Sequence, residues 1–313
     1  MKSDIYFALT LILIIFLSAC VKTSNVPSAK SIILCNKKDL ITIENYRVSK
    51  KIVNEGENTS IYFSLTNNCA FEINNINLII FDPSAFGSND YSISCGNKKG
   101  KHISIDLKRY DIIDCNISLT SPSQIDTSIP ARVGFYLKYN LSSNKVITIP
   151  VIDGKTVKIP PSKYSESEIK YGYLDFKVNP PIGNIREEDG KVIKEYWGVN
   201  NEPFVVEFFL RPMFSGIGSF MNIELNNLQI KLEDNKLEVN DKNCDFEKAN
   251  NYIIKSDVLR LLREAGTNDW KDFKIVCEFI YNSNSPISYP KIELVADYNV
   301  TIYFFEDFVI KKK

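Results

Sequence analysis

The sequence predicts an all-β protein made of two antiparallel β-sandwich domains, each stapled by disulfides, with one helix in the second domain. Three observations support this prediction. Apolar and polar residues alternate in many short runs, turn residues separate those runs, and the chain contains enough cysteines for several disulfides. A polar stretch that contains Gly154, Pro160 and Pro161 marks a boundary between the two domains.

The first sandwich is expected over residues 32–152. Its alternation places Ile61, Phe63 and Leu65 on one face of a strand, and similar runs recur along this half of the chain. No helical periodicity competes with them, so an antiparallel sandwich is the architecture that the pattern favours. The expected strands cover residues 40–48, 59–66, 76–82, 102–107, 114–119, 131–139 and 145–151.

The second sandwich is expected over residues 171–310, after a linker over 153–170. One helix interrupts it, because Ser256 suits an N-cap, Asp257 suits the positive helix N-terminus and Gly266 suits the C′ position. The remaining runs alternate as strands do. These strands are expected at residues 174–178, 204–210, 221–232, 236–239, 273–281 and 294–305.

Cysteine usage predicts three disulfides. Six cysteines follow Cys20, and an even number in an oxidising compartment indicates disulfide bonds. Cys244–Cys277 is the natural pair of the second domain. In the first domain three pairings are possible, of which Cys95–Cys115 with Cys35–Cys69 is favoured. Closing a loop of about 20 residues stabilises a fold by about 3 kcal/mol in the chain-entropy model. The six residues are Cys35, Cys69, Cys95, Cys115, Cys244 and Cys277.

The N-terminus predicts export and lipidation. A short apolar run over residues 5–17 leads into Leu17-Ser18-Ala19-Cys20, which resembles the lipobox of prokaryotic membrane lipoproteins. The resemblance implies that residues 1–19 are a signal peptide and that Cys20 carries diacylglycerol. Residues 20–31 would then be a tether at the cell surface. A cleaved signal without lipid and an uncleaved anchor remain alternatives.

A second resemblance lies in the first domain. Residues 48–57, with an acidic-glycine turn at Glu55-Gly56-Glu57, lead into the strand Ile61-Tyr62-Phe63-Ser64-Leu65-Thr66-Asn67. This stretch resembles immunoglobulin-like modules of the CARDB kind, which occur in bacterial and archaeal surface proteins. The resemblance implies an immunoglobulin-like adhesion or spacer fold and no activity.

Composition argues against several classes of function. The chain has 38 Lys and Arg against 38 Asp and Glu, so no basic excess indicates nucleic-acid binding. The only histidine, His102, lies in an expected strand, so histidine-based catalysis is disfavoured. No catalytic, metal-binding or cofactor motif occurs, and Glu306 and Asp307 are interpreted as solvated carboxylates. We therefore expect no enzyme activity, no cofactor and no metal.

Two sets of residues are candidates for surface chemistry. The stretch from Phe208 to Met221 is almost wholly apolar yet broken by proline and glycine, so it predicts either a partner-binding apolar loop or two buried strands joined by a turn. Sequons predict sites of glycosylation if the host modifies them. The candidate partner-binding residues are Phe209, Met213, Phe214, Ile217 and Phe220, and the candidate glycosylation sites are Asn58, Asn116, Asn140 and Asn299.

These patterns together predict a non-enzymatic surface lipoprotein. It would act in adhesion or as a structural or accessory subunit of a membrane-bound assembly, held to the membrane by its lipid and binding a protein partner through edge strands or apolar docking. A solute-capturing lipoprotein is one alternative, although that class is usually rich in helices. An extracellular hydrolase that uses two carboxylates is the other alternative.

Overall fold

The computed structural model describes residues 35, 39–86, 90–154, 164–167, 172–188, 191–213, 220–265, 267 and 269–313. Within these ranges the chain is mostly β-structure, as the sequence predicts. The described ranges contain one α-helix, α2 (Ser256–Ala265), and two short 3-10 helices, η1 (Ser84–Phe86) and η2 (Trp270–Asp272).

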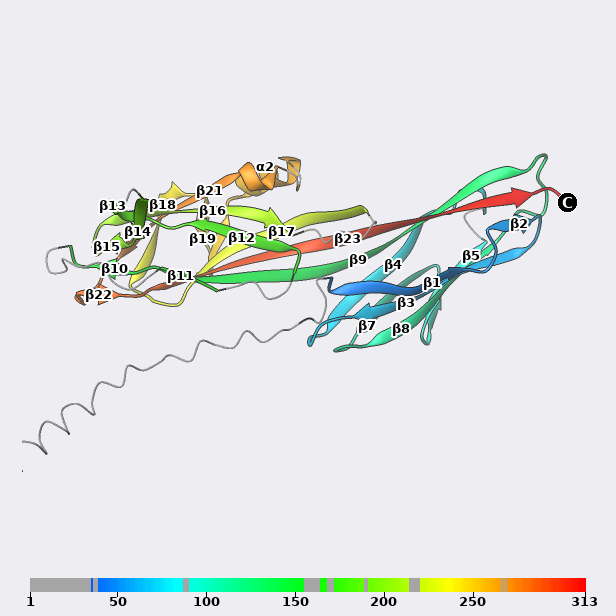
Figure 1. The fold of residues 1–313 in the computed structure, drawn as a ribbon, viewed down its shortest axis with the longest axis horizontal. Helices are drawn as coiled ribbons and strands as arrows, with labels where there is room; N and C mark the ends of the chain where they lie inside the picture. Colours follow the sequence, from blue (N-terminus) through cyan, green and yellow to red (C-terminus); the bar gives the residue numbers. More distant parts are fainter. Residues whose placement is uncertain are drawn as a thin grey trace, which may run out of the picture. The chain divides into compact units, whose positions relative to one another are not determined.

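The largest sheet of the described chain is built around two long strands, β9 (Ile129–Thr148) and β23 (Lys291–Lys311). They pair antiparallel from Lys291 opposite Thr148 to Ile310 opposite Ile129, without a shift in register (Figure 1). The strand order is β19 (Phe246–Lys248), β20 (Tyr252–Ile254), β17 (Phe220–Leu232), β23, β9, β4 (Ile73–Asp82) and β7 (His102–Leu107), with β2 (Ile52–Asn54) on β23 and β11 (Ser165–Glu166) on β9.

Two further sheets pack on the long pair. The five-stranded sheet contains, in order, β1 (Ile41–Val48), β3 (Asn58–Asn67), β8 (Ile112–Thr120), β5 (Tyr91–Cys95) and β6 (Lys98–Gly100). The four-stranded sheet contains β12 (Leu174–Asn179), β16 (Pro203–Pro212), β21 (Lys274–Tyr281) and β18 (Leu237–Cys244). Smaller sheets join β15 (Gly198–Val199), β10 (Val151–Ile152) and β22 (Ile287–Ser288), and pair β13 (Ile182–Glu188) with β14 (Lys191–Tyr196).

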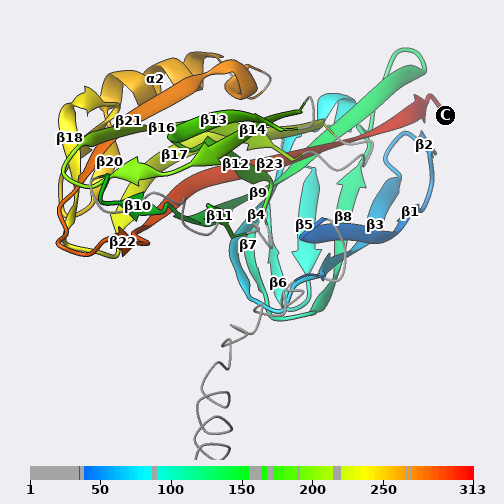
Figure 2. The same cartoon turned by 60° about the vertical axis from the view of Figure 1, so that its left-hand side comes forward.

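The core lies on one face of the long pair. Odd-numbered side chains of β9 point inward along the strand, because successive side chains of a strand alternate between its two faces. Phe63 of β3 stacks on Phe135 of β9 with ring centroids 5.5 Å apart. Phe208 of β16 meets Phe246 of β19 edge to face at 6.4 Å. The five-stranded and four-stranded sheets therefore both pack against the large sheet (Figure 2).

A buried tyrosine cluster links the chain before β1 to the long pair. The Tyr173 hydroxyl accepts the backbone N–H of Leu40 at 3.2 Å, and the Tyr173 backbone N–H donates to the Tyr298 hydroxyl at 2.9 Å. Burial raises the pKa of Tyr173 to about 12. Gly172 has φ +111° and an added Cβ would lie 2.4 Å from Ser143 Oγ, so only glycine fits beside this cluster.

The described residues form three disulfides, and they are the pairs that the sequence favours: Cys35–Cys69, Cys95–Cys115 and Cys244–Cys277. Cys95 and Cys115 lie opposite each other on β5 and β8, and Cys244 and Cys277 do so on β18 and β21. Each of these two bonds therefore ties neighbouring strands of one sheet. Disulfides of this kind indicate an oxidising, extracytoplasmic environment.

The structure corrects the strand boundaries in several places. The sequence pattern predicts separate strands over residues 131–139 and 145–151, whereas β9 runs unbroken through Thr148. Its alternation persists because Asn140, Ser142 and Asn144 are exposed while Ser143 is buried. The last strand continues to Lys311 rather than ending at 305, and β5, β6, β13 and β14 were not expected.

The helix also starts slightly differently. The Lys255 carbonyl accepts the Leu259 N–H at 2.9 Å, which makes Lys255 the N-cap and Ser256 the first helical residue. Gly266, the expected C′ residue, lies outside the described residues. The division into two domains at 153–170 stays a prediction, and the large sheet contains strands from both sides of that boundary.

Removing one disulfide gives a first prediction. Replacing both Cys244 and Cys277 by alanine frees a 33-residue span of the unfolded chain, so we expect the free energy of unfolding to fall by about 4 kcal/mol. Urea unfolding of the oxidised wild type and the double variant measures this difference. A loss below about 1 kcal/mol would show that the bond hardly constrains the unfolded chain.

Candidate binding groove

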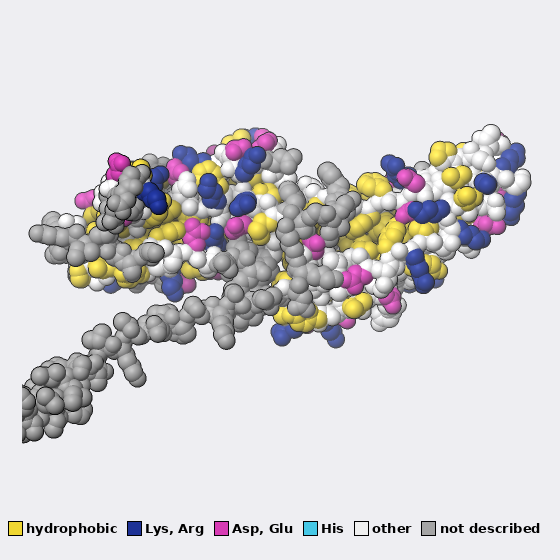
Figure 3. All heavy atoms as spheres, viewed as in Figure 1, with side chains coloured by type: hydrophobic (Ala, Val, Ile, Leu, Met, Phe, Trp, Pro, Cys, Tyr) yellow, Lys and Arg dark blue, Asp and Glu magenta, His cyan; other side chains and the backbone are white. Residues whose placement is uncertain are grey.

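An apolar groove of about 680 Å³ lies between β1 and β23. Such a volume lies in the range of small binding sites. Figure 3 shows hydrophobic side chains exposed together over this part of β23. The residues that line the groove are Asp39, Ile41, Thr42, Ile43, Tyr46, Leu137, Tyr173, Met221, Ile302, Tyr303, Phe304, Phe305 and Glu306.

Beside this groove, one edge of β23 has no neighbouring strand among the residues that the structure describes. β17 pairs with β23 as far as Phe220 opposite Tyr303, and β2 pairs with β23 from Val309 onward. Among the described residues, none pairs with Phe304–Phe308 on the side opposite β9. We call this stretch the open edge of β23.

The open edge presents backbone hydrogen-bonding groups. The Val309 N–H donates to the Lys51 carbonyl at 2.9 Å, so Val309 faces the β2 side of the strand. Backbone groups of a strand alternate between its two sides, and β23 keeps its register with β9 throughout. Phe305 and Asp307 therefore direct their N–H and C=O groups toward the side on which no described residue pairs with β23.

A bulge in β1 shapes the opposite wall of the groove. The pairing of β1 with β3 shifts between Glu44 and Arg47, and Asn45 within the bulge has φ +53°. Asparagine tolerates this left-handed conformation better than most residues. A bulge redirects side chains, and here the redirected Tyr46 reaches across to β23.

Glu306 closes the polar end of the groove. The Tyr46 hydroxyl donates to Glu306 Oε2 at 2.8 Å, and Lys51 Nζ lies 2.6 Å from Oε1. Burial and the contact with Glu306 raise the pKa of Tyr46, while the hydrogen bond to Glu306 raises the pKa of Lys51. Both oxygens of this carboxylate, which is 8% exposed, are thus engaged in holding β1 and β2 against β23.

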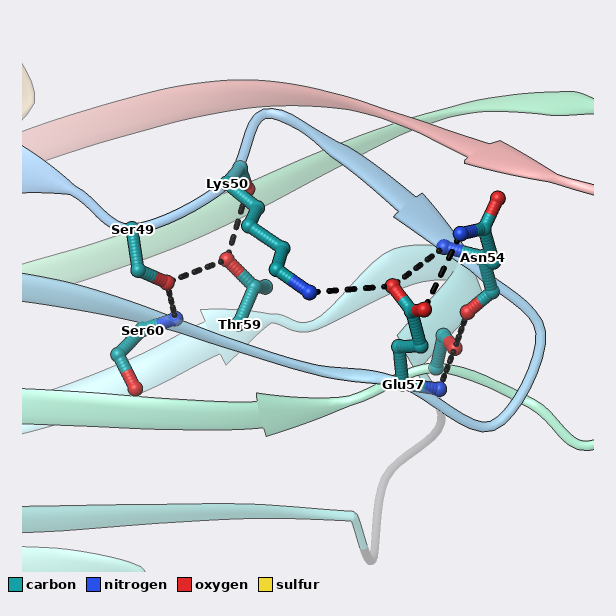
Figure 4. Close-up of polar contacts among 7 residues, drawn as sticks. Ser49, Lys50, Asn54, Glu57, Thr59 and Ser60 are labelled. Atoms are coloured by element: carbon teal, nitrogen blue, oxygen red, sulfur yellow. Dashed lines mark hydrogen bonds and ion pairs between the residues drawn. The ribbon is translucent and has the colours of Figure 1, made fainter.

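A polar network fixes the connection from β1 through β2 to β3 (Figure 4). Glu57 accepts hydrogen bonds from the Asn54 side chain at 3.1 Å and from Lys50 Nζ at 3.3 Å. Thr59 Oγ1 donates to the Lys50 carbonyl at 2.7 Å, and Ser49 Oγ lies 3.1 Å from Thr59 Oγ1. This network holds β2 at the end of the open edge.

The outer face of the same strands carries an exposed aromatic cluster, made of Phe81, Tyr136, Tyr303 and Phe305. Phe81 and Phe305 are 43% and 51% exposed, and their rings meet edge to face at 5.6 Å. Phe81 lies directly over Gly134, where an added Cβ would be 2.5 Å from its ring. Exposed aromatic side chains in contact with one another are typical of binding surfaces.

A charged pair borders the aromatic cluster. Arg132 Nε donates to Asp307 Oδ1 at 2.7 Å, and the Arg132 guanidinium lies 5.9 Å from the centre of the Phe305 ring. Asp307 holds the pKa of Arg132 above its ordinary value, and Arg132 lowers the pKa of Asp307. The cluster therefore has an apolar centre and a polar rim, which is the usual composition of a protein interface.

Only some of the predicted partner-binding residues lie within the described ranges. Phe209 and Met213 are half-buried, at β16 and just beyond it, where Lys177 Nζ lies 5.5 Å from the centre of the Phe209 ring. Phe220 begins β17 and pairs with Tyr303, so its backbone borders the open edge. Phe214 and Ile217 lie outside the described residues, and partner binding by these five residues stays a prediction.

The other predicted sites have varied surroundings. Cys20 lies outside the described residues. Asn58 and Asn140 are exposed in strands. The Asn116 side chain donates to Ser118 Oγ at 3.1 Å, and that of Asn299 donates to Asn226 Oδ1 at 3.1 Å. Glycosylation stays a prediction at all four sequons.

Sequence reasoning missed the Glu306 contacts. Glu306 was interpreted as solvated, yet it is buried because β23 continues past residue 305 with its alternation intact. Phe304, Glu306 and Phe308 share the inward face. Extending the period-two pattern through residue 308 would have placed Glu306 there.

No protein-family model matches the chain, and no curated protein matches it. Similar solved structures include an alkylpurine DNA glycosylase of Pseudomonas fluorescens bound to DNA, with 14% identity over 33% of this chain and 28% of that chain, at TM-score 0.22. A secreted serine protease of Vibrio cholerae has 12% identity, coverages of 83% and 50%, and TM-score 0.19. A collagen adhesin of S. aureus has 11% identity, coverages of 88% and 93%, and TM-score 0.14.

The chain covers less than two thirds of the first two of these proteins. At such TM-scores none of these likenesses carries an argument about fold or function. Within the described ranges, no three His, Cys, Asp or Glu side chains are placed to hold a metal ion together. None of the helices in those ranges is long and apolar enough to cross a bilayer.

The packing of Phe81 on Gly134 gives a prediction for the aromatic cluster. Gly134→Ala pushes its Cβ into the Phe81 ring, so we expect a loss of about 1 kcal/mol in the free energy of unfolding. In a Phe81→Ala background the same substitution should stabilise by about 0.5 kcal/mol, because alanine is stiffer than glycine in the unfolded chain. Urea unfolding of the wild type, the two single variants and the double variant gives the free energies of this double-mutant cycle. If Gly134→Ala changed the free energy of unfolding equally with Phe81 and with alanine at position 81, the contact between Gly134 and Phe81 would be contradicted.

The Glu57 network gives a pH prediction. Hydrogen bonds from the Asn54 side chain and backbone lower the pKa of Glu57 below its ordinary value. A carboxylate with a lowered folded pKa adds stability above its ordinary pKa and loses it as the pH falls through the folded value. We expect the wild type to be more stable than Glu57→Gln at neutral pH, and the difference to vanish on acidification. Thermal unfolding across pH measures this, with Glu247→Gln controlling for the lost charge. A difference that does not change with pH would refute the role of the carboxylate.

Proposed function

We propose that this protein is a non-enzymatic, membrane-anchored protein that acts outside the cytoplasm by binding a protein partner. It works in adhesion or as a structural or accessory subunit of a membrane-bound assembly. The observation that carries the proposal is the open edge of β23, with an apolar groove beneath it and the aromatic cluster beside it.

The N-terminal sequence supports anchoring, and the disulfides support export. The Leu17-Ser18-Ala19-Cys20 stretch supplies a lipid attachment point, and a diacylglycerol holds a chain to a bilayer more firmly than one acyl chain does. The three disulfides support export to an oxidising compartment. The residues after Cys20 serve as a tether between the lipid and the folded chain.

The partner contributes an extended segment that adds a strand to β23. Phe305 and Asp307 together offer two N–H and two C=O groups. A short strand added to the sheet by β-augmentation can form hydrogen bonds with all four groups. Alternate side chains of that segment enter the groove, whose wall is formed by Ile43, Phe304 and other apolar residues. The partner strand is therefore apolar at every second residue.

The two strand edges at the groove differ in how they are protected. β1 is an edge strand interrupted by its bulge at Asn45 and by charged Glu44 and Arg47, which are devices that prevent unwanted pairing. The open edge of β23 has no bulge relative to β9. No described residue protects this edge of β23, whereas β1 is bulged, and this difference favours a role for β23 in pairing with a partner.

A pair of variants at Asp307 tests the proposal. Asp307→Pro removes the backbone N–H that faces the open edge but leaves pairing with β9 intact, since proline is tolerated where the N–H faces away from the sheet. Asp307→Ala removes the same carboxylate and keeps the N–H. The two variants thus differ in the backbone N–H of residue 307, which the proposed partner strand would bind.

Intact cells that express each variant are cross-linked, and the chain is recovered through its membrane anchor for mass spectrometry. We expect one partner linked through Lys51, which is exposed beside the groove, in the wild type and Asp307→Ala. At least a tenfold loss is expected with Asp307→Pro, provided that thermal unfolding shows a folded chain. Equal recovery with both variants, or a wild type without a partner at Lys51, would overturn the proposal.

A further inference from the structure

A buried lysine lies apart from the groove, at the other end of β9. Lys145 is 7% exposed and its side chain points inward, on the same face as the buried Ser143 and Ile147. Burying an ammonium group is costly unless carboxylates and hydrogen bonds compensate it. The groups that surround Lys145 Nζ must therefore compensate the energetic penalty of burying it.

Two carboxylates from different strands meet at this amine. Lys145 Nζ lies 2.6 Å from Glu166 Oε2 and 3.4 Å from Asp175 Oδ1, and it donates to the Phe176 carbonyl. Glu166 comes from β11 and Asp175 from β12. The amine of β9 is thus held against a carboxyl group of the facing sheet, and a second carboxyl group contacts the same amine.

Glu166 is held in place from its far side. The Tyr164 hydroxyl donates to Glu166 Oε1 at 2.6 Å, which leaves Oε2 directed at Lys145. The backbone of this short segment is fixed by Ser165 opposite Thr148 and by the Ser167 N–H, which donates to the Val146 carbonyl at 2.8 Å. A positioned carboxylate in contact with an amine is suited to carry protons to and from it.

We propose that Lys145 and Asp175 are joined by an isopeptide bond that forms within the folded chain, with Glu166 as the catalytic proton carrier. The Lys145 amine and the Asp175 carboxyl group are already close together. Holding two reactants side by side corresponds to an effective concentration of about 10⁵ M or more. The partly buried site also limits the water that would reverse the reaction.

The reaction balances without any external reagent. One proton passes from the Lys145 ammonium through Glu166 to the Asp175 carboxylate, which gives a neutral amine and a neutral carboxylic acid. Nζ then attacks Asp175 Cγ. Glu166 takes a second proton from Nζ and delivers it to the departing hydroxyl, so the Cγ–O bond breaks and one water leaves. The amide keeps one hydrogen on Nζ, and Glu166 returns to its carboxylate form.

The bond would tie the large sheet to the four-stranded sheet through β9 and β12. It would close a loop between residues 30 positions apart, comparable in length to the loops closed by the disulfides. Unlike a disulfide, an amide is not broken by thiol reductants. The cross-link would therefore persist where the three disulfides are reduced.

Peptide mapping of the full-length protein tests the proposal. The protein is purified from its membrane, denatured, reduced, alkylated and digested, and the peptides are identified by mass spectrometry. We expect the peptides that contain Lys145 and Asp175 to appear as one linked species, lighter than their sum by one water. Separate, unmodified peptides, or a link from Lys145 to Glu166, would overturn the proposal.

Matched variants assign the roles. Lys145→Arg keeps the positive charge but has no primary amine, so it should abolish the link to residue 175. Glu166→Gln leaves both reacting groups in place and should reduce the linked fraction at least tenfold. Full linkage in Glu166→Gln would refute the role of Glu166. Water loss that persists in Lys145→Arg belongs to another site, such as a cyclised Asp153-Gly154, and would overturn the assignment to Lys145.

Discussion

The structure depends on the uninterrupted pairing of β9 with β23. Twenty residues of each strand stay in register, so each inward side chain of one strand is matched by an inward side chain of the other. A slip by one residue would turn Phe135 and Lys145 toward solvent and Tyr136 toward the core. The five-stranded and four-stranded sheets both pack on the face that this register defines.

The long pair also contains the open edge, on which the proposed function depends. β17 and β2 cover β23 on either side of Phe304–Phe308, and the network around Glu57 and the contact of Lys51 with Glu306 fix the end of β2. The open edge is thus bounded by strands paired with β23 on both sides. The proposed pairing of a partner strand at this edge would need little rearrangement of the chain.

Much of the fold could be predicted from local pattern. The alternation of Ile61, Phe63 and Leu65, the helix after Lys255 and the disulfide Cys95–Cys115 all follow from residues close together in the sequence. The unbroken course of β9 could not be predicted this way, because Asn140 and Ser142 look like turn residues. Their place in a strand is decided by their partners in β23, far along the chain.

The candidate sites were harder to predict than the fold for the same reason. Glu306 and Tyr46 are 260 residues apart in sequence, and Lys145 meets Asp175 across two sheets. Spacing within the chain carries no signal for such contacts. The open edge could not be predicted from the sequence either, because it is defined by where β17 and β2 end and not by the residues of β23 themselves.

Amide hydrogen exchange measured residue by residue by NMR tests the central claim, which is that β23 has an open edge. The account predicts an alternating pattern in the isolated protein. The amides of Phe304, Glu306 and Phe308, which face β9, should be protected, while those of Phe305 and Asp307 should exchange at least a hundredfold faster. Uniform protection across all five residues would show that the edge is already covered and would contradict the account.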